Sequence, residues 1–289
     1  MRENIIKSFD GEEIWYRITG EGKHTLLLAD GIACTGYVWD YIIPYFKDYF
    51  RIIHFNYRGH GKTPAPKSYE NVTVLASVKD MNAILEYENI DKAILLGHSM
   101  GVQVIYEFYN QYREKVEALI PMCGSYGHPM QSYHNTNKFE PIFKMLVNFI
   151  FKPYSSVTKT VQKLFVHNSI AYWFVANTEI NGKMVKKSDF MAYLEEISNH
   201  LDLKSFGYML DSAMEHSALD VLPEIDVPVL IIAGKLDKMT PAFLSTKMYK
   251  LIPNSKLEVL EWGSHTAPIE QPEMTNLLVE DFLVENGFM

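Results

Sequence analysis

The sequence predicts an α/β protein with a mostly parallel β-sheet, covered on both faces by helices and interrupted by a helical insert. Short apolar runs alternate with helical patterns up to Met122 and again after Val227, which is typical of such a sheet. Residues 125–216 lack this alternation and are rich in Phe, Tyr and Met. We therefore expect one core built from residues 1–124 and 217–289, with residues 125–216 as the insert; a chain of 289 residues is long enough for both.

The first half of the chain begins with a predicted β-hairpin. Asp10-Gly11, a pair favoured in tight turns, separates two strand-like runs, Glu3 to Phe9 and Glu12 to Ile18. The elements that follow are assigned from continuous apolar runs or from helical spacing. They are a strand at Thr25–Ala29, a helix at Val38–Phe46, a strand at Arg51–Phe55, a helix at Val72–Tyr87, a strand starting at Ala93 with a helix directly after Gly101, and a strand at Val116–Met122.

The second half resumes the same alternation after the insert. A buried strand is predicted at Val227–Ala233, a helix from about Pro241, a strand at Lys256–Leu260 and a last amphipathic helix over Glu273–Glu285. No internal repeat or low-complexity linker interrupts these elements.

Composition and charge exclude several classes of protein. The formal net charge is −8 without a basic stripe, which argues against nucleic acid as a partner. The two cysteines, Cys34 and Cys123, are too few for a disulfide framework and favour a reducing compartment. The N-terminus has no apolar signal region, and no run approaches the roughly 18 apolar residues of a membrane span. We expect a cytoplasmic protein; no spacing of the ten histidines resembles a metal site, so neither a metal nor a cofactor is expected.

A candidate nucleophile lies in the Gly97-His98-Ser99-Met100-Gly101 segment. This G-x-S-x-G pattern stands between a predicted buried strand and a predicted helix, the context that a nucleophile elbow requires. Glycines on both sides let strand and helix approach closely around a strained serine. A buried structural serine is the alternative interpretation, but we expect Ser99 to be the nucleophile and His98 to pack beneath the turn.

A serine hydroxyl needs a base, and the base needs an acid to orient it. On this architecture the acid and the histidine should follow the last two strands in that order. Asp237 lies just past the strand at 227–233, and His265 lies past the strand at 256–260. A solvated loop aspartate is the alternative for Asp237, but the loop after the strand at 116–122 contains no competing carboxylate. His128 and His216, near the ends of the insert, remain candidates for lining the cleft.

Acyl transfer also needs donors for the oxyanion that forms on the substrate, usually two backbone N–H groups. One is expected from Met100, the residue after the nucleophile. The other is expected from Ile32, in the loop Asp30-Gly31-Ile32 that follows the first long buried strand.

Together these motifs make the chain resemble an α/β-hydrolase with a helical cap. The matching segments are the G-x-S-x-G pattern, Asp237, the Gly-Ser-His ending at His265, and Asn56-Tyr57-Arg58-Gly59-His60-Gly61. The last resembles the family's D-x-R-G-x-G loop with Asn56 in place of aspartate, and Asp30-Gly31 departs from the commoner His-Gly. The resemblance implies a core sheet of about eight strands and a pocket between the core and the cap.

Within that family, a serine at the elbow implies acyl chemistry, because relatives that open epoxides or displace halide use an aspartate there. We expect a serine hydrolase that cleaves carboxylic esters of small or medium apolar acyl groups through an acyl-enzyme. Hydrolysis of thioesters, lactones, amides or carbon–carbon bonds remains open. Hydroxynitrile lyases and cofactor-free haloperoxidase-like members of the family also keep the serine and stay open, as does a slow-turnover ligand receptor of the same fold.

The insert gives a weak indication of the substrate. From Met130 to Phe165 it is apolar and carries five lysines, against the single acid Glu140; the lysines are Lys138, Lys144, Lys152, Lys159 and Lys163. Such a segment can receive an acyl chain or contact an anionic lipid surface. A cap helix that packs on the core and keeps its lysines in solvent is the simpler interpretation. The expected partner is a small apolar ester.

Overall fold

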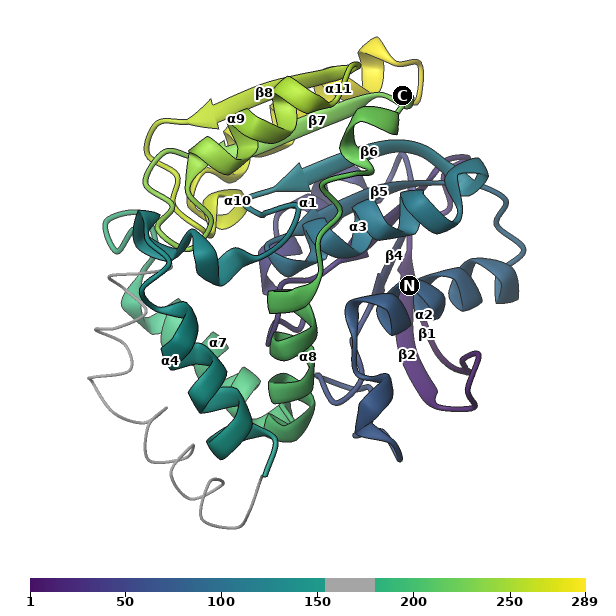
Figure 1. The fold of residues 1–289 in the computed structure, drawn as a ribbon. Coiled ribbons are helices and arrows are strands. Elements are labelled where there is room, and N and C mark those ends of the chain that lie inside the picture. The colour runs from purple at the N-terminus through teal and green to yellow at the C-terminus, as the bar shows by residue number, and fades with distance from the viewer. Residues whose placement is uncertain (154–179) are drawn as a thin grey trace.

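The core is a sheet of eight strands in the order β1-β2-β4-β3-β5-β6-β7-β8. The computed structural model describes residues 1–153 and 180–289 (Figure 1). β1 pairs antiparallel with β2, and β2 with β4, whereas every later pairing is parallel. The predicted mostly parallel sheet of about eight strands is thus confirmed. The strands are β1 (Arg2–Lys7), β2 (Glu13–Thr19), β3 (Thr25–Ala29), β4 (Arg51–Phe55), β5 (Ala93–His98), β6 (Val116–Met122), β7 (Val229–Gly234) and β8 (Ser255–Leu260).

Helices cover both faces of this sheet because both faces of its central strands are apolar. In β3, Leu27 packs into one hydrophobic cluster while its neighbours Leu26 and Leu28 pack into the other. The first cluster includes side chains of α2, α3 and α9, and the second includes side chains of α1, α10 and α11. This two-sided burial explains the continuous apolar runs of the sequence. The helices are α1 (Ile42–Phe46), α2 (Val74–Tyr87), α3 (Met100–Gln111), α9 (Ala242–Leu251), α10 (Ala267–Glu270) and α11 (Pro272–Glu285).

The helix predicted over Val38–Phe46 is divided in the structure. A 3₁₀ turn spans Tyr37–Trp39, and α1 begins only at Ile42. Pro44 explains the break, because a proline inside one continuous helix would lack the N–H that bonds the carbonyl four residues earlier. In the observed arrangement Pro44 lies in the first turn of α1, where that N–H is not needed.

The described part of the insert consists of helices that follow β6 and precede β7. They are α4 (Glu140–Leu146), a π-helical turn at Val147–Phe151, α7 (Lys187–His200) and α8 (Leu203–Glu215). They gather at one end of the molecule, near the carboxyl ends of the strands (Figure 1). The chain enters and leaves this region side by side, since Gly127 and Ser217 form an antiparallel bridge. The described part of the insert therefore lies at the carboxyl ends of the strands.

Candidate active site

Ser99 occupies the sharp turn between β5 and α3. Its φ is 55° and its ψ is −117°, a conformation that costs a residue other than glycine about 1–3 kcal/mol. A Cβ on Gly97 would lie 2.5 Å from the carbonyl oxygen of Gly101, and a Cβ on Gly101 would lie 2.1 Å from that of Ala29. Both positions therefore require glycine. The turn holds Ser99 at the N-terminus of α3, where the helix dipole favours negative charge.

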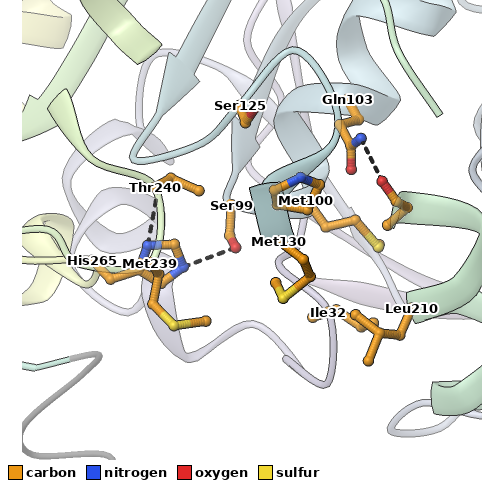
Figure 2. Close-up of a pocket in the computed structure, with 12 residues that line it drawn as sticks. Ile32, Ser99, Met100, Gln103, Ser125, Met130, Leu210, Met239, Thr240 and His265 are labelled. Atoms are coloured by element: carbon orange, nitrogen blue, oxygen red, sulfur yellow. Dashed lines mark hydrogen bonds between the residues drawn. The ribbon is translucent and has the colours of Figure 1, made fainter. Parts of the chain in front are cut away.

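The structure brings Ser99, His265 and Asp237 into one hydrogen-bonded chain. Nε2 of His265 lies 2.8 Å from Oγ of Ser99, and Nδ1 lies 2.9 Å from Oδ2 of Asp237. Ser99 follows β5, Asp237 follows β7 and His265 follows β8, so the segments after the carboxyl ends of three strands supply all three. Figure 2 shows the His265 ring between Ser99 and Thr240. Asp237 and His265 are each only 5% exposed.

The neighbours of Asp237 determine which nitrogen of His265 carries the proton. The Asp237 carboxylate accepts hydrogen bonds from the Met239 and Thr240 amides, each at 2.8 Å, and from the Thr240 hydroxyl at 2.8 Å. Because a carboxylate accepts, Nδ1 of His265 donates to it and Nε2 is left to accept the Ser99 proton. This arrangement can deprotonate a serine hydroxyl during nucleophilic attack.

Two buried groups that the sequence analysis did not identify as functional fix the loop carrying His265. One Glu270 oxygen accepts from the Ser264 amide at 2.6 Å, and the other accepts from the Thr266 hydroxyl at 3.0 Å. Nε2 of His98 lies 2.8 Å from the carbonyl oxygen of His265, to which it donates. Burial, with the nearby His265, lowers the pKa of His98 to about 4, so this ring is neutral at pH 7. The expectation that His98 packs beneath the turn omitted this hydrogen bond.

The loop expected to supply an oxyanion donor is fixed by a buried polar network. The Asp30 carboxylate accepts from Nε1 of Trp39 at 2.6 Å and from Nε2 of His54 at 2.9 Å. The Tyr57 hydroxyl donates to the Asp30 carbonyl at 2.8 Å. A Cβ on Gly31 would lie 3.1 Å from Cβ of Ser99, so the loop packs directly against the candidate nucleophile. The hydrogen bonds from Trp39 and His54 thus explain why an aspartate can stand at position 30, where histidine is commoner in the family.

The structure places Ile32 and Met100, whose amides are the predicted oxyanion donors, around Ser99. Ile32 lies directly after Gly31 in this loop, and Met100 is the first residue of α3. Both side chains line the space around Ser99 (Figure 2). Their assignment as oxyanion donors remains a prediction.

Two chambers meet at Ser99. The smaller has a volume of about 40 Å³ and the larger of about 330 Å³. The larger is walled by aromatic and aliphatic side chains, many from the insert, including Phe190, Tyr193 and Phe206. Among the described residues, none that lines either chamber is Lys, Arg, Asp or Glu. The residues that line both are Ile32, Ser99, Met130, Leu210, Met239 and His265.

The other candidates from the sequence lie outside these chambers. Nδ1 of His128 lies 2.9 Å from the carbonyl oxygen of Met214. Nε2 of His216 lies 3.1 Å from a carboxylate oxygen of Glu107. Arg58, in the loop that resembles the family motif, instead joins the buried carboxylate of Asp80 at 2.7 Å. These two histidines, which the sequence left only as candidates for lining the cleft, are absent from the described linings of both chambers.

The basic character predicted for the insert is partly neutralised by ion pairs. Lys144 pairs with Glu140 at 2.9 Å, and Lys152 pairs with Asp211. Phe149 is 77% exposed beside them. Lys159 and Lys163 lie outside the described residues. Contact with a lipid surface remains a prediction.

The described residues contain neither a membrane-spanning helix nor a cluster of possible metal ligands. No helix in residues 1–153 or 180–289 is both long and apolar enough to cross a membrane. In the same part of the chain, no group of three or more His, Cys, Asp or Glu side chains is placed to hold a metal ion.

Comparison with known proteins places this geometry in context. The family model described as "alpha/beta hydrolase fold" matches residues 24–272. A 2-hydroxy-6-oxononadienedioate/2-hydroxy-6-oxononatrienedioate hydrolase of Paraburkholderia phymatum is 24% identical over 97% of this chain and 94% of its own. Epoxide hydrolase 1 of Caenorhabditis elegans is also 24% identical, over 98% of this chain and 72% of its own.

Solved structures show the same fold at low sequence identity. The enol-lactonase of Burkholderia xenovorans has a TM-score of 0.79 at 18% identity, covering 97% of this chain and 100% of that one. An esterase of Thermogutta terrifontis has a TM-score of 0.79 at 19% identity, covering 99% of both chains.

Proposed function

Because the chain belongs to the alpha/beta hydrolase fold family, we propose that it is a serine hydrolase of carboxylic esters with small or medium apolar acyl groups. The observation that carries the proposal is the hydrogen-bonded chain from Ser99 through His265 to Asp237. The aromatic and aliphatic walls of the larger chamber support the choice of acyl group, because an apolar acyl chain is stabilised by contact with an apolar surface.

In this mechanism Ser99 Oγ attacks the ester carbonyl while its proton passes to Nε2 of His265. The Asp237 carboxylate stabilises the resulting imidazolium, and the Ile32 and Met100 amides donate to the oxyanion. His265 then protonates the departing alcohol, which leaves an acyl group on Ser99. A water molecule, deprotonated by His265, attacks this acyl-enzyme and releases the acid.

Carbon–carbon bond hydrolysis is the second candidate, because the Paraburkholderia relative is named for it. A dioate substrate would bring two carboxylates into the site, and buried carboxylates need cationic or multiple hydrogen-bonding partners. The described linings of both chambers contain neither Lys nor Arg. This observation favours an uncharged ester.

The proposal is tested by steady-state hydrolysis of p-nitrophenyl esters of increasing acyl length. We expect turnover with an optimum at medium length, and a loss of roughly 10⁴-fold or more in Ser99→Ala. Ser188→Ala, at an exposed serine of α7, is the matched control. Turnover in Ser99→Ala equal to that of the wild type would refute the proposal. A single slow event per molecule would instead favour a ligand receptor of the same fold.

A further inference from the structure

Gln103, on the first turns of α3, carries a buried oxygen that nothing in the described chain satisfies. The side chain is 1% exposed, and it lines the smaller chamber beside Ser99. Its Oε1 has no hydrogen-bond partner among the described residues. A buried carbonyl oxygen left unpaired costs about 1–3 kcal/mol, so such an atom in a binding chamber calls for an explanation.

The orientation of the Gln103 amide is fixed by its other end. Nε2 donates to the Ala213 carbonyl at 3.0 Å and to the His216 carbonyl at 3.3 Å. Carbonyl oxygens only accept, so the amide nitrogen must face them and Oε1 must face away. Figure 2 shows the dashed line from the Gln103 nitrogen to the accepting carbonyl, with the Gln103 oxygen on the Met100 side.

The other hydroxyl groups of the smaller chamber have their protons engaged elsewhere. The Ser125 hydroxyl donates to the Gly127 carbonyl at 2.6 Å. The Thr240 hydroxyl donates to Asp237 at 2.8 Å. Neither proton is left for Oε1 of Gln103, so a molecule that enters the chamber can supply the missing donor.

We propose that Gln103 determines specificity by accepting a hydrogen bond from a hydroxyl group on the alcohol portion of the substrate. The inference rests on the proposed ester hydrolysis, in which the larger apolar chamber takes the acyl chain. The smaller chamber then takes the alcohol. With about 40 Å³ it holds only about three or four groups the size of a water molecule, each of which needs about 10–15 Å³. A two-carbon alcohol ending in a hydroxyl fits this space and places a donor at its end.

The substrate class that follows is an apolar acyl ester of a short alcohol with a second polar group. The ester carbonyl lies at Ser99, where the chambers meet, and the acyl chain lies against the insert. The second hydroxyl of the alcohol donates to Gln103, and the reaction that consumes the released alcohol must accept a free diol.

The test uses two pairs of esters in which a hydroxyl replaces a methyl group of the same size. In the first pair, 2-hydroxyethyl hexanoate and propyl hexanoate, the change lies in the alcohol. In the second, hexyl 3-hydroxypropanoate and hexyl butanoate, it lies in the acyl group. Acid release is followed by pH-stat in the wild type and in Gln103→Met, a substitution that keeps the shape but removes the acceptor. The quantity compared is the ratio of kcat/KM within each pair, which does not depend on the absolute activity of a variant.

We expect the wild type to prefer the hydroxyl in the first pair, and Gln103→Met to lose that preference by roughly tenfold, the effect of one neutral hydrogen bond. The second pair should show no change between the proteins. His128→Leu is the control for loosening of α8, because His128 bonds the neighbouring Met214 carbonyl but lines neither chamber; it should keep the wild-type ratios.

Three results would overturn the inference. They are equal ratios in the wild type and Gln103→Met, a change confined to the second pair, and a loss of preference in His128→Leu equal to that in Gln103→Met. Failure of the proposed function is separable from these, since it would appear as ester turnover that survives Ser99→Ala.

Discussion

The core loops and the insert helices both surround Ser99, but they contribute different kinds of side chain. From the core come Asp237, His265 and Glu270, which are buried polar groups with several hydrogen bonds each. The insert contributes Phe190, Tyr193 and other side chains that line the larger chamber with mainly apolar surface. Hydrogen bonds fix direction within narrow limits, whereas apolar contacts are nondirectional.

This difference suggests a division of labour. The proposed chemistry depends on the core, where a displacement of about 1 Å can cost 100-fold in rate. The choice of acyl group depends on the insert, where a change of shape alters the fit by about 0.8 kcal/mol for each methylene group buried or exposed. Substitutions in the two regions should therefore differ both in size of effect and in which kinetic quantity changes.

The largest effect is expected for Asp237→Asn on the core side. An amide at this position can donate to Nδ1 of His265, which would leave the proton on Nε2 and prevent it from accepting from Ser99. We expect kcat to fall roughly 10⁴-fold, by analogy with the same change in other triads. Asp211→Asn, which removes a carboxylate from the insert helix α8, is the matched control. A loss of less than tenfold in Asp237→Asn would contradict the assigned role.

His98→Gln should change the pH dependence of folding stability. The His98 pKa is about 4 in the folded protein, against an ordinary value of 6.5. Between these values the unfolded chain binds a proton that the folded protein does not, so stability falls as pH is lowered through this window, by about 3 kcal/mol in total. Glutamine keeps a donor for the His265 carbonyl but does not titrate.

The measurement is urea denaturation of both proteins at pH 7 and pH 4.5. The wild type should lose more stability than His98→Gln between the two values. An equal loss of unfolding free energy in the two proteins would show that His98 does not titrate in this way.

Glu270→Gln tests whether the support behind His265 matters to the rate. The amide and the hydroxyl of Ser264 both donate to the Glu270 carboxylate. A glutamine would turn an NH₂ group toward one of them, so that two donors would face each other. The loop should shift, and we expect kcat to fall roughly 10–100-fold with little change in acyl-length preference. Glu273→Gln, at an exposed position of α11, should retain wild-type kinetics. An altered length preference in Glu270→Gln would contradict the division between core and insert.

The smallest effect is expected from Phe190→Leu in the insert. Phe190 is buried and lines the larger chamber, so a smaller side chain should admit a longer acyl group. We expect the optimum in the p-nitrophenyl ester series to move to longer chains, with selectivity changing roughly fourfold for each methylene. Phe149→Ala, at an exposed insert position, should leave the series unchanged. An unchanged optimum in Phe190→Leu would show that the acyl chain lies elsewhere.

The sequence predicted the core much better than the details of the site. Strands β3, β5 and β6 were predictable because burial on both faces leaves continuous apolar runs, and the turn at Ser99 because its glycines are required by backbone contacts. Asp237 and His265 could be selected because the carboxyl ends of parallel strands meet at one edge of the sheet.

What the sequence did not reveal depends on partners far away in the chain. Gln103 sits among ordinary helix residues, and its bond to Ala213 joins positions 110 residues apart. Glu270 has the same character, since a glutamate near a helix is usually exposed, and only the folded loop shows that it holds the residues on both sides of His265. The break in the predicted helix at 38–46 could have been foreseen from Pro44 alone.

The central claim, that Ser99 carries the acyl group, is tested most directly by mass spectrometry of the acyl-enzyme. The protein is mixed with p-nitrophenyl hexanoate, quenched in acid within the first turnovers and digested. The account predicts a hexanoyl adduct on the peptide containing Ser99, present in the wild type and absent from Ser99→Ala. Product released without any adduct on this peptide, or an adduct on another residue that persists in Ser99→Ala, would contradict it.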